Sequence, residues 1–333
     1  IAESIKDLGY ESALHSFIIE DVAEVIGLFP SDDDKAALRD VIEERRSEQL
    51  ATLSLSEVAF LHLYDVSPEE MKNICKSGWG SMGSTLSDIP DEDFRALVHY
   101  CIGHLCRVYQ MNSMSLPREQ SEAWYMAKLW GFLNIIFDSD EGLEHQPGEV
   151  LCYASGQQIT DGLVLSAHTR LELCIIEAVK KDGVACTKAL LDTRKMAKAM
   201  KNMHNEIRAK ATESIHSQLI TYGIRISGAS IALYTLRQRQ GRFYQLCNEG
   251  TVTFPAKWDS SGVTTKLILS VLEWVLAFKK DMSVMANKFP DWTYMPVGGI
   301  KPGVQDHQAA TLTTPINSPR LSPVTTPGQA SCT

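Results

Sequence analysis

Two acidic residues, Asp161 and Glu177, stand at the ends of two apolar segments whose composition is typical of neighbouring strands. Asp161 opens the segment 161–165, and Glu177 closes the segment 171–177. Carboxylates at adjacent strand ends can bind a hard divalent cation such as Mg2+, and a nearby lysine can offset charge on a phosphate or on the attacking water. Because Lys180 follows Glu177 closely, the pattern predicts a site for phosphodiester hydrolysis. The alternative interpretation is two solvated loop carboxylates, since acidic clusters are often structural.

The sequence around these acids predicts the elements that must position them. Amphipathic segments predict helices over 121–138, 187–211 and 264–285. Apolar segments predict strands over 149–155, 161–166 and 170–178, and a hairpin-like pair between 223 and 246. The predicted order is helix, three strands, helix, two strands and helix, which belongs to the α+β class.

This order of elements resembles the PD-(D/E)XK nuclease fold, and more closely a large group of uncharacterised fungal proteins of that fold. The resemblance covers about residues 118–288, roughly half of the chain. It implies that Asp161 is the central aspartate and Glu177 the second acid of the site. It further implies that Lys180 is the lysine and Glu122 the optional glutamate of the first helix.

Two positions depart from the motif of that fold. Thr160 stands before Asp161 where the family has proline, and Lys180 stands one place later than a Glu-x-Lys tripeptide requires. In a strand, a displacement of one residue turns a side chain to the opposite face. Lysines can migrate to the following helix in this fold, so Lys195 and Lys198 are the other candidates for the cation.

The helix predicted over 187–211 has an apolar stripe that limits these candidates. At about 100° per residue, one face collects Met196, Met200, Met203 and Ile207. Lys198 lies nearly opposite this stripe, whereas Lys195 flanks it more closely. If the stripe packs on the sheet, Lys198 faces solvent and Lys195 stays a candidate for the site.

The composition of the 333-residue chain is that of a globular protein with a sizeable core. Apolar residues make up 44% of it, and no segment of about 18 consecutive apolar residues predicts a transmembrane helix. The eight cysteines include no Cys-x-x-Cys pair, and several lie within apolar segments, as buried thiols in a reducing compartment would. We therefore expect an intracellular protein, nuclear or cytoplasmic, that does not associate with a membrane.

Negative charge is concentrated towards the N-terminus. Residues 1–60 carry 14 acidic and 5 basic side chains, so their net charge of −9 equals that of the whole chain. Residues 225–242 contain four arginines and no acid, which predicts a modest positive surface suited to a phosphate backbone. The overall acidity argues against tight, non-specific nucleic-acid binding by the intact chain.

These patterns divide the chain into three regions. Residues 1–117 are predicted to be a helical region that covers the core or meets a protein partner, and residues 118–295 to be the PD-(D/E)XK-like core. Residues 296–333 lack hydrophobic periodicity and predict a disordered tail. The tail holds four Ser/Thr-Pro dipeptides, candidate sites for proline-directed kinases, which begin at Thr314, Ser318, Ser322 and Thr326.

Two functions from different classes fit this sequence. The first is a Mg2+-dependent nuclease whose metal is bound by Asp161 and Glu177. Glu122 or Glu149 would support the metal, and one of the three candidate lysines would stabilise charge. The second is a module that keeps the fold without the chemistry and binds nucleic acid or a protein. The sequence does not distinguish DNA from RNA as the partner.

Overall fold

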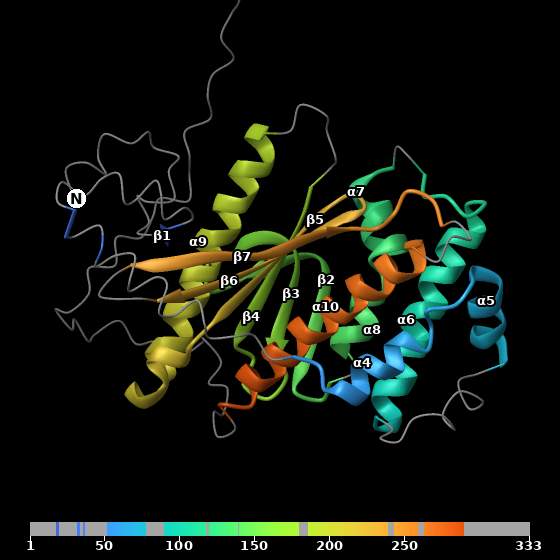
Figure 1. Ribbon diagram of the computed structural model, residues 1–333. Coiled ribbons are helices and arrows are strands. Elements are labelled where there is room, and N and C mark those ends of the chain that lie inside the picture. Colours follow the sequence, from blue (N-terminus) through green and yellow to red (C-terminus); the bar gives the residue numbers. More distant parts are fainter. Residues whose placement is uncertain are drawn as a thin grey trace, which may run out of the picture. The chain divides into compact units, whose positions relative to one another are not determined.

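The computed structural model describes most of the chain between residues 52 and 289 (Figure 1). The described residues are 18–19, 32–33, 36, 52–77, 90–117, 120–138, 140–179, 186–238, 243–258 and 263–289. Several subjects of the sequence predictions lie outside the described residues: most of residues 1–51, Lys180, the arginines at 239 and 242, and the tail 296–333.

A seven-stranded mixed sheet forms the centre, with the strand order β1-β7-β6-β5-β4-β3-β2. The strands are β1 (Ile18–Ile19), β2 (Leu143–Cys152), β3 (Gln158–Ser166), β4 (Glu172–Val179), β5 (Thr221–Ser227), β6 (Ser230–Gln238) and β7 (Tyr244–Thr253). β4 and β5 are parallel, as are β1 and β7, and the other neighbours are antiparallel. The α+β class is confirmed, and so are the strands predicted over 161–166 and 170–178. The strand predicted over 149–155 begins earlier, at Leu143, and ends at Cys152. The predicted pair between 223 and 246 is wrong in number, because the chain also turns between Ser227 and Ser230 and forms three strands, β5, β6 and β7.

Helices cover both faces of this sheet (Figure 1). They are α4 (Leu55–His62), α5 (Pro68–Ser77), α6 (Glu92–Met111), α7 (Glu122–Trp124), the π-helical turn η4 (Tyr125–Leu129), α8 (Phe132–Asp138), α9 (Cys186–Lys210), the 3-10 turn η5 (Glu213–Gln218) and α10 (Val263–Ala286). Side-chain oxygens accept hydrogen bonds from first-turn N–H groups of three helices, at Ser54 for α4, Asp91 for α6 and Ser121 for α7.

One face of the sheet is covered by the methionine stripe of α9. Met196, Met200 and Met203 are fully buried and share a core cluster with Leu163 of β3. Gly223 in β5 permits this close approach, because a Cβ there would lie 2.8 Å from Sδ of Met200. The three methionines of the stripe therefore pack on the sheet, whereas Ile207 belongs to the other core cluster.

The other face of the sheet carries the remaining helices. One core cluster joins Leu105 of α6, Phe137 of α8 and Leu272 of α10 to Ile176 of β4. The helices before residue 117 therefore contribute to the same hydrophobic core as the sheet. The helical prediction for residues 1–117 does not hold at Ile18–Ile19, which pair with the outer edge of β7 as a short strand. Pairing there covers backbone groups that the sheet edge would otherwise expose.

The helix predicted over 121–138 is interrupted in the middle. α7 widens into η4, and the chain turns at Gly131 before α8 begins. A Cβ at Gly131 would lie 2.7 Å from the carbonyl oxygen of Ala127, so a larger residue would have to displace the backbone. His104 Nε2 lies 2.7 Å from the carbonyl oxygen of Lys128 and partners a group of the widened turn. The prediction of one continuous helix is wrong here, because a side chain from α6 and a close backbone contact stabilise the break.

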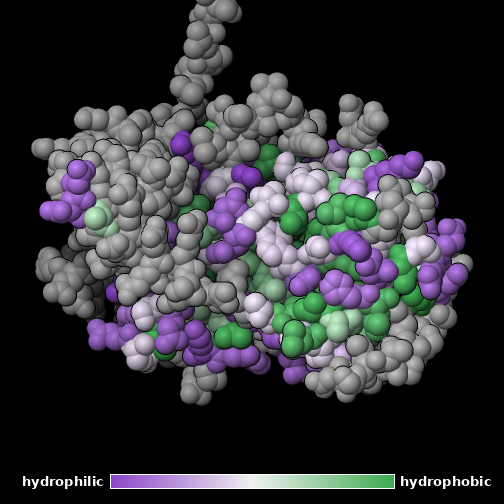
Figure 2. Space-filling model, viewed as in Figure 1, coloured by the Kyte–Doolittle hydropathy of each residue, from purple (hydrophilic) through white to green (hydrophobic). Residues whose placement is uncertain are grey.

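The surface on the helical side of the molecule has an apolar character. Figure 2 shows hydrophobic residues gathered at the right of the view, over the side that carries α10 and its neighbours. Exposed large apolar side chains on these helices include Leu55 of α4 and Leu267 and Val284 of α10. In the part of the chain that the structure describes, no helix is long and apolar enough to span a membrane.

Candidate functional site

β3 and β4 separate where the two predicted metal ligands stand. Their antiparallel register ends at Gly162↔Ile176, and Asp161 and Glu177 are the next residues of the two strands. Thr160 Oγ1 donates a hydrogen bond to the carbonyl oxygen of Ile176 at 2.6 Å. Thr160 therefore bonds directly to the last paired residue, at the point where the strands part.

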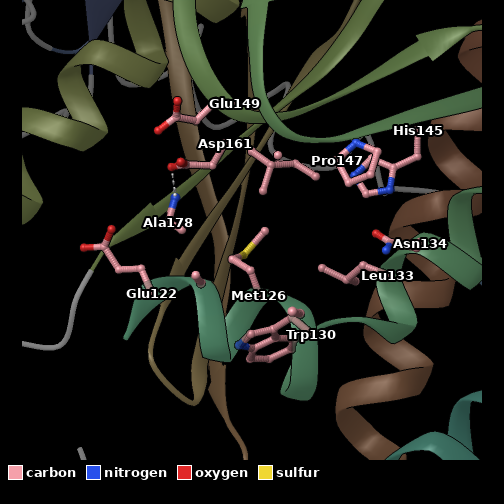
Figure 3. A pocket seen from close by; sticks show the side chains of 14 residues that line it. Glu122, Met126, Trp130, Leu133, Asn134, His145, Pro147, Glu149, Asp161 and Ala178 are labelled. Carbon is pink, nitrogen blue, oxygen red and sulfur yellow. Dashed lines mark hydrogen bonds between the residues drawn. The ribbon is translucent and has the colours of Figure 1, made fainter. Parts of the chain in front are cut away.

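Asp161 is held at this opening by the backbone of β4. Its Oδ2 accepts a hydrogen bond from the N–H of Ala178 at 2.7 Å (Figure 3). Because Ala178 follows Glu177 in the chain, this bond ties the aspartate to the strand that carries the second acid. The carboxylate is partly exposed, so a ligand can reach it.

Glu177 is buried and pairs with a lysine from α9. Lys195 Nζ lies 3.1 Å from Oε2, to which it donates a hydrogen bond, and 3.0 Å from Oε1. The same Nζ donates to the carbonyl oxygen of Ile159 at 3.0 Å. The contact with Oε1 lacks hydrogen-bond geometry, so among the described residues no group donates a hydrogen bond to this buried oxygen. The site thus contains one carboxylate oxygen with unused acceptor capacity.

Burial raises the pKa of Glu177 to about 7. The charge and hydrogen bond of Lys195 lower this pKa, whereas the nearby carboxylates of Asp161 and Asp192 raise it. Burial and the two nearby acids disfavour the charged form of this carboxyl, and a cation bound beside it would favour that form. The electrostatics therefore suit a positive ligand beside Glu177.

The three candidate lysines differ in their places. Lys195 of α9 contacts Glu177. Lys198 is half-buried rather than fully solvated, and burial, with the charge of Arg194, lowers its pKa. Lys180 lies outside the described residues. Of the described candidates, Lys195 is the one in contact with the second acid.

Three acids meet in a pocket of about 420 Å3 on the face of the sheet opposite α9. Asp161, Glu122 of α7 and Glu149 of β2 lie towards one end of it (Figure 3). His145 and Asn134 lie towards the other end. The structure thus brings Glu122 and Asp161 into one pocket, while Glu177 points to the α9 side.

A further acid, Glu172, which is not among the predicted site residues, anchors the β2–β3 hairpin. Its carboxylate accepts hydrogen bonds from the N–H groups of Tyr153 at 2.7 Å and Ala154 at 3.0 Å, and from Sγ of Cys152. Glu172 pairs with Leu165 at the far end of the β3–β4 ladder, so these bonds tie β4 to the residues that follow β2. Its position inside an apolar strand was the available signal, because a buried carboxylate needs donors.

The predicted positive surface is only partly described. Arg225 sits next to Glu177 in the β4–β5 register, donates a hydrogen bond to Thr193 of α9, and lies over the ring of Tyr234. Arg237 is buried. The two described arginines are therefore engaged with the protein interior, and the other two, 239 and 242, lie outside the described residues.

The donor set suits a weakly enclosed hard cation. Across the described residues, no group of three or more His, Cys, Asp or Glu side chains is arranged to hold a metal ion. Mg2+ commonly takes only one or two protein carboxylates and completes its shell with water and phosphate oxygens. Asp161 fits that requirement, because it is partly exposed in the pocket, whereas Glu177 is buried in its ion pair with Lys195 on the α9 side.

The comparisons with known proteins return nothing: no family model, no curated protein and no solved structure matches this chain.

Proposed function

We propose that the protein is a Mg2+-dependent phosphodiesterase of the PD-(D/E)XK type that acts on nucleic acid. The observation that carries this proposal is the contact between Lys195 and the buried Glu177, beside Asp161, where β3 and β4 part. An acid, a second acid and a lysine at diverging strand ends are the three groups that this chemistry needs. Here the lysine comes from the helix after the strand.

Asp161 would hold the metal, with Glu122 and Glu149 at the same end of the pocket in support. Glu177 would complete the site if its side chain left Lys195 and turned from the α9 side. A bound Mg2+ would lower the pKa of its water and neutralise charge on the phosphate. Asp161 is pre-oriented for this task by its hydrogen bond from Ala178.

Lys195 has a separate role from the acids. Its side chain is partly exposed, and its Nζ is fixed between Glu177 and the carbonyl oxygen of Ile159. A cation held in this way can stabilise the charge that develops on a phosphate during attack, without having to reorganise.

The test is a cleavage assay on labelled single- and double-stranded DNA and RNA with Mg2+, with Mn2+ and with EDTA. We expect metal-dependent cleavage, with losses of about 100-fold or more for Asp161→Asn, Glu177→Gln and Lys195→Met. Lys198→Met and Glu206→Gln, on the same helix as Lys195, are the matched controls and should keep activity. Equal activity of Lys195→Met and Lys198→Met would refute the assignment of the lysine.

A second candidate function is a binding module without catalysis. The observation that favours it is the same ion pair: Lys195 already neutralises the carboxylate that a metal would need. Calorimetry with Mn2+ separates the two functions. An unmutated protein that binds oligonucleotides but neither binds Mn2+ nor cleaves would be a binding module of this fold.

A further inference from the structure

The pocket on the helical face contains a polar side chain that the proposed chemistry does not use. His145, in β2, is only 8% exposed, and neither ring nitrogen has a hydrogen-bond partner among the described residues. Its ring packs edge-on against Phe137 with 5.6 Å between centroids, so its orientation is fixed. A buried donor and acceptor left without partners destabilise the fold, and a ligand in the pocket that bonded to them would remove this cost.

Apolar side chains form much of the wall of this pocket. Met126, Leu133 and Trp130 line the pocket, and Trp130 is held by a hydrogen bond of 2.8 Å from its Nε1 to the carbonyl oxygen of Gly228. The amide of Asn134 lies at the same end as His145 (Figure 3). Apolar walls with a few convergent polar groups are typical of sites for small planar ligands.

The charges along the pocket disfavour a phosphate at the end that holds His145 and Asn134. No lysine or arginine is among its lining residues, all of which the structure describes, and Glu122 and Glu149 stand at the end near Asp161. A phosphate could enter only beside a metal at Asp161. The end that holds His145 and Asn134 suits a neutral group with its own hydrogen-bond donors and acceptors.

We propose that this pocket receives one unstacked nucleobase of the substrate, next to the phosphate at Asp161, and that His145 and Asn134 read its edge. The inference rests on the proposed function, because it takes the chain at Asp161 to be nucleic acid. A base turned out of its stack is recognised by hydrogen bonds to its edge and by contact with aromatic or apolar side chains. The pocket volume of about 420 Å3 accommodates a nucleoside.

The test uses the four free ribonucleosides, with ribose as the control, in EDTA, so that the metal site plays no part. The protein carries 13C-labelled methionine methyl groups, and Met126→Leu assigns the resonance of Met126. We expect at least one nucleoside to shift the Met126 methyl signal, and ribose not to. Met203, buried on the opposite face of the sheet, should not respond.

Two variants remove the binding by different means. His145→Phe keeps a ring but removes both nitrogens, and Ala123→Trp fills the pocket from an exposed position on α7. Each variant should weaken nucleoside binding at least tenfold, whereas Ala209→Trp, at an exposed position on α9, should leave it unchanged. Ala123→Trp keeps the test valid if His145→Phe does not fold.

The inference is overturned if no nucleoside shifts the methyl signal of Met126, if ribose shifts it equally, or if neither variant weakens nucleoside binding. Nucleoside binding without any cleavage would uphold the pocket and refute the nuclease. Cleavage without nucleoside binding would refute the pocket proposal and uphold the nuclease.

Discussion

The raised pKa of Glu177 results from burial rather than from its neighbours in the sequence. β4 is covered on both faces, so an acid in this strand is buried whichever way it points, and Glu177 is 4% exposed. Its partner, Lys195, stands 18 positions later, on another element. A buried carboxylate with one lysine is costly to maintain, and such costs are common at functional sites.

His204, which lies away from the site, tests at the residue scale how burial changes the pKa of a side chain. This side chain of α9 is fully buried, with its ring edge-on to Tyr244. Burial, together with the positive charges of Arg208 and His216, lowers its pKa to about 4. A lowered pKa contributes stability that is present above the unfolded value near 6.5 and is lost as the pH falls towards 4. Between pH 7.5 and pH 5, His204 should cost the fold on the order of 2 kcal/mol.

Urea unfolding at both pH values measures this loss. His204→Met should show a smaller fall in the free energy of unfolding than the unmutated protein, by about the same 2 kcal/mol. His168→Gln, at an exposed position, is the control and should keep the original pH dependence. Identical pH dependence for His204→Met and the unmutated protein would show that His204 ionises freely in the fold.

At the scale of elements, the break between α7 and α8 shapes the wall of the pocket. The widened turn η4 carries Met126 and Ala127, and Leu133 follows in α8. A continuous α-helix would rotate these positions relative to one another, because each residue advances about 100°. The pocket therefore depends on the break.

We predict that Gly131→Ala destabilises the protein by about 1–3 kcal/mol, because its Cβ would press on the carbonyl oxygen of Ala127 and on the ring of His104. Gly103→Ala is the matched control, since a Cβ there meets nothing within 4 Å inside α6. The control should be neutral or stabilising by up to about 1 kcal/mol. Thermal and urea unfolding measure both, and equal stability of the two variants would contradict the packing at Gly131.

At the scale of the whole molecule, the helices before residue 117 are joined to the segment after β7. Tyr109 donates a hydrogen bond from its hydroxyl to the carbonyl oxygen of Pro255 at 2.6 Å. The N–H of Trp258 donates to the carbonyl oxygen of Met114 at 2.8 Å, and Ser115 pairs with Lys257 as a bridge. Together with the shared core cluster, these contacts make α6 part of the support of α8 and α10.

We therefore predict that a fragment of residues 118–295 does not fold cooperatively. Without α4 to α6 it would expose the apolar side of α8 and α10 that the shared core buries. Near-ultraviolet circular dichroism and thermal unfolding of the fragment and the full chain would measure this. A sharp cooperative transition of the fragment would show that 118–295 is an independent domain, as a boundary at 117 implies.

The sequence by itself determined the kinds of elements and most of their places. The methionine period of α9, the apolar segments of β3 and β4, and the acids at 161 and 177 all depend only on residues close together in the chain. Local periodicity reflects which face of an element meets the core, so it can be found without knowing what lies opposite.

Only the tertiary structure decided which groups meet. It selected Lys195 as the partner of Glu177, gave His145 a pocket without hydrogen-bond partners, and broke the helix at Gly131 through contacts with α6. Each of these depends on atoms from elements far apart in the sequence. The energy of such contacts comes from burial and exact distance, which no local spacing of residue types records.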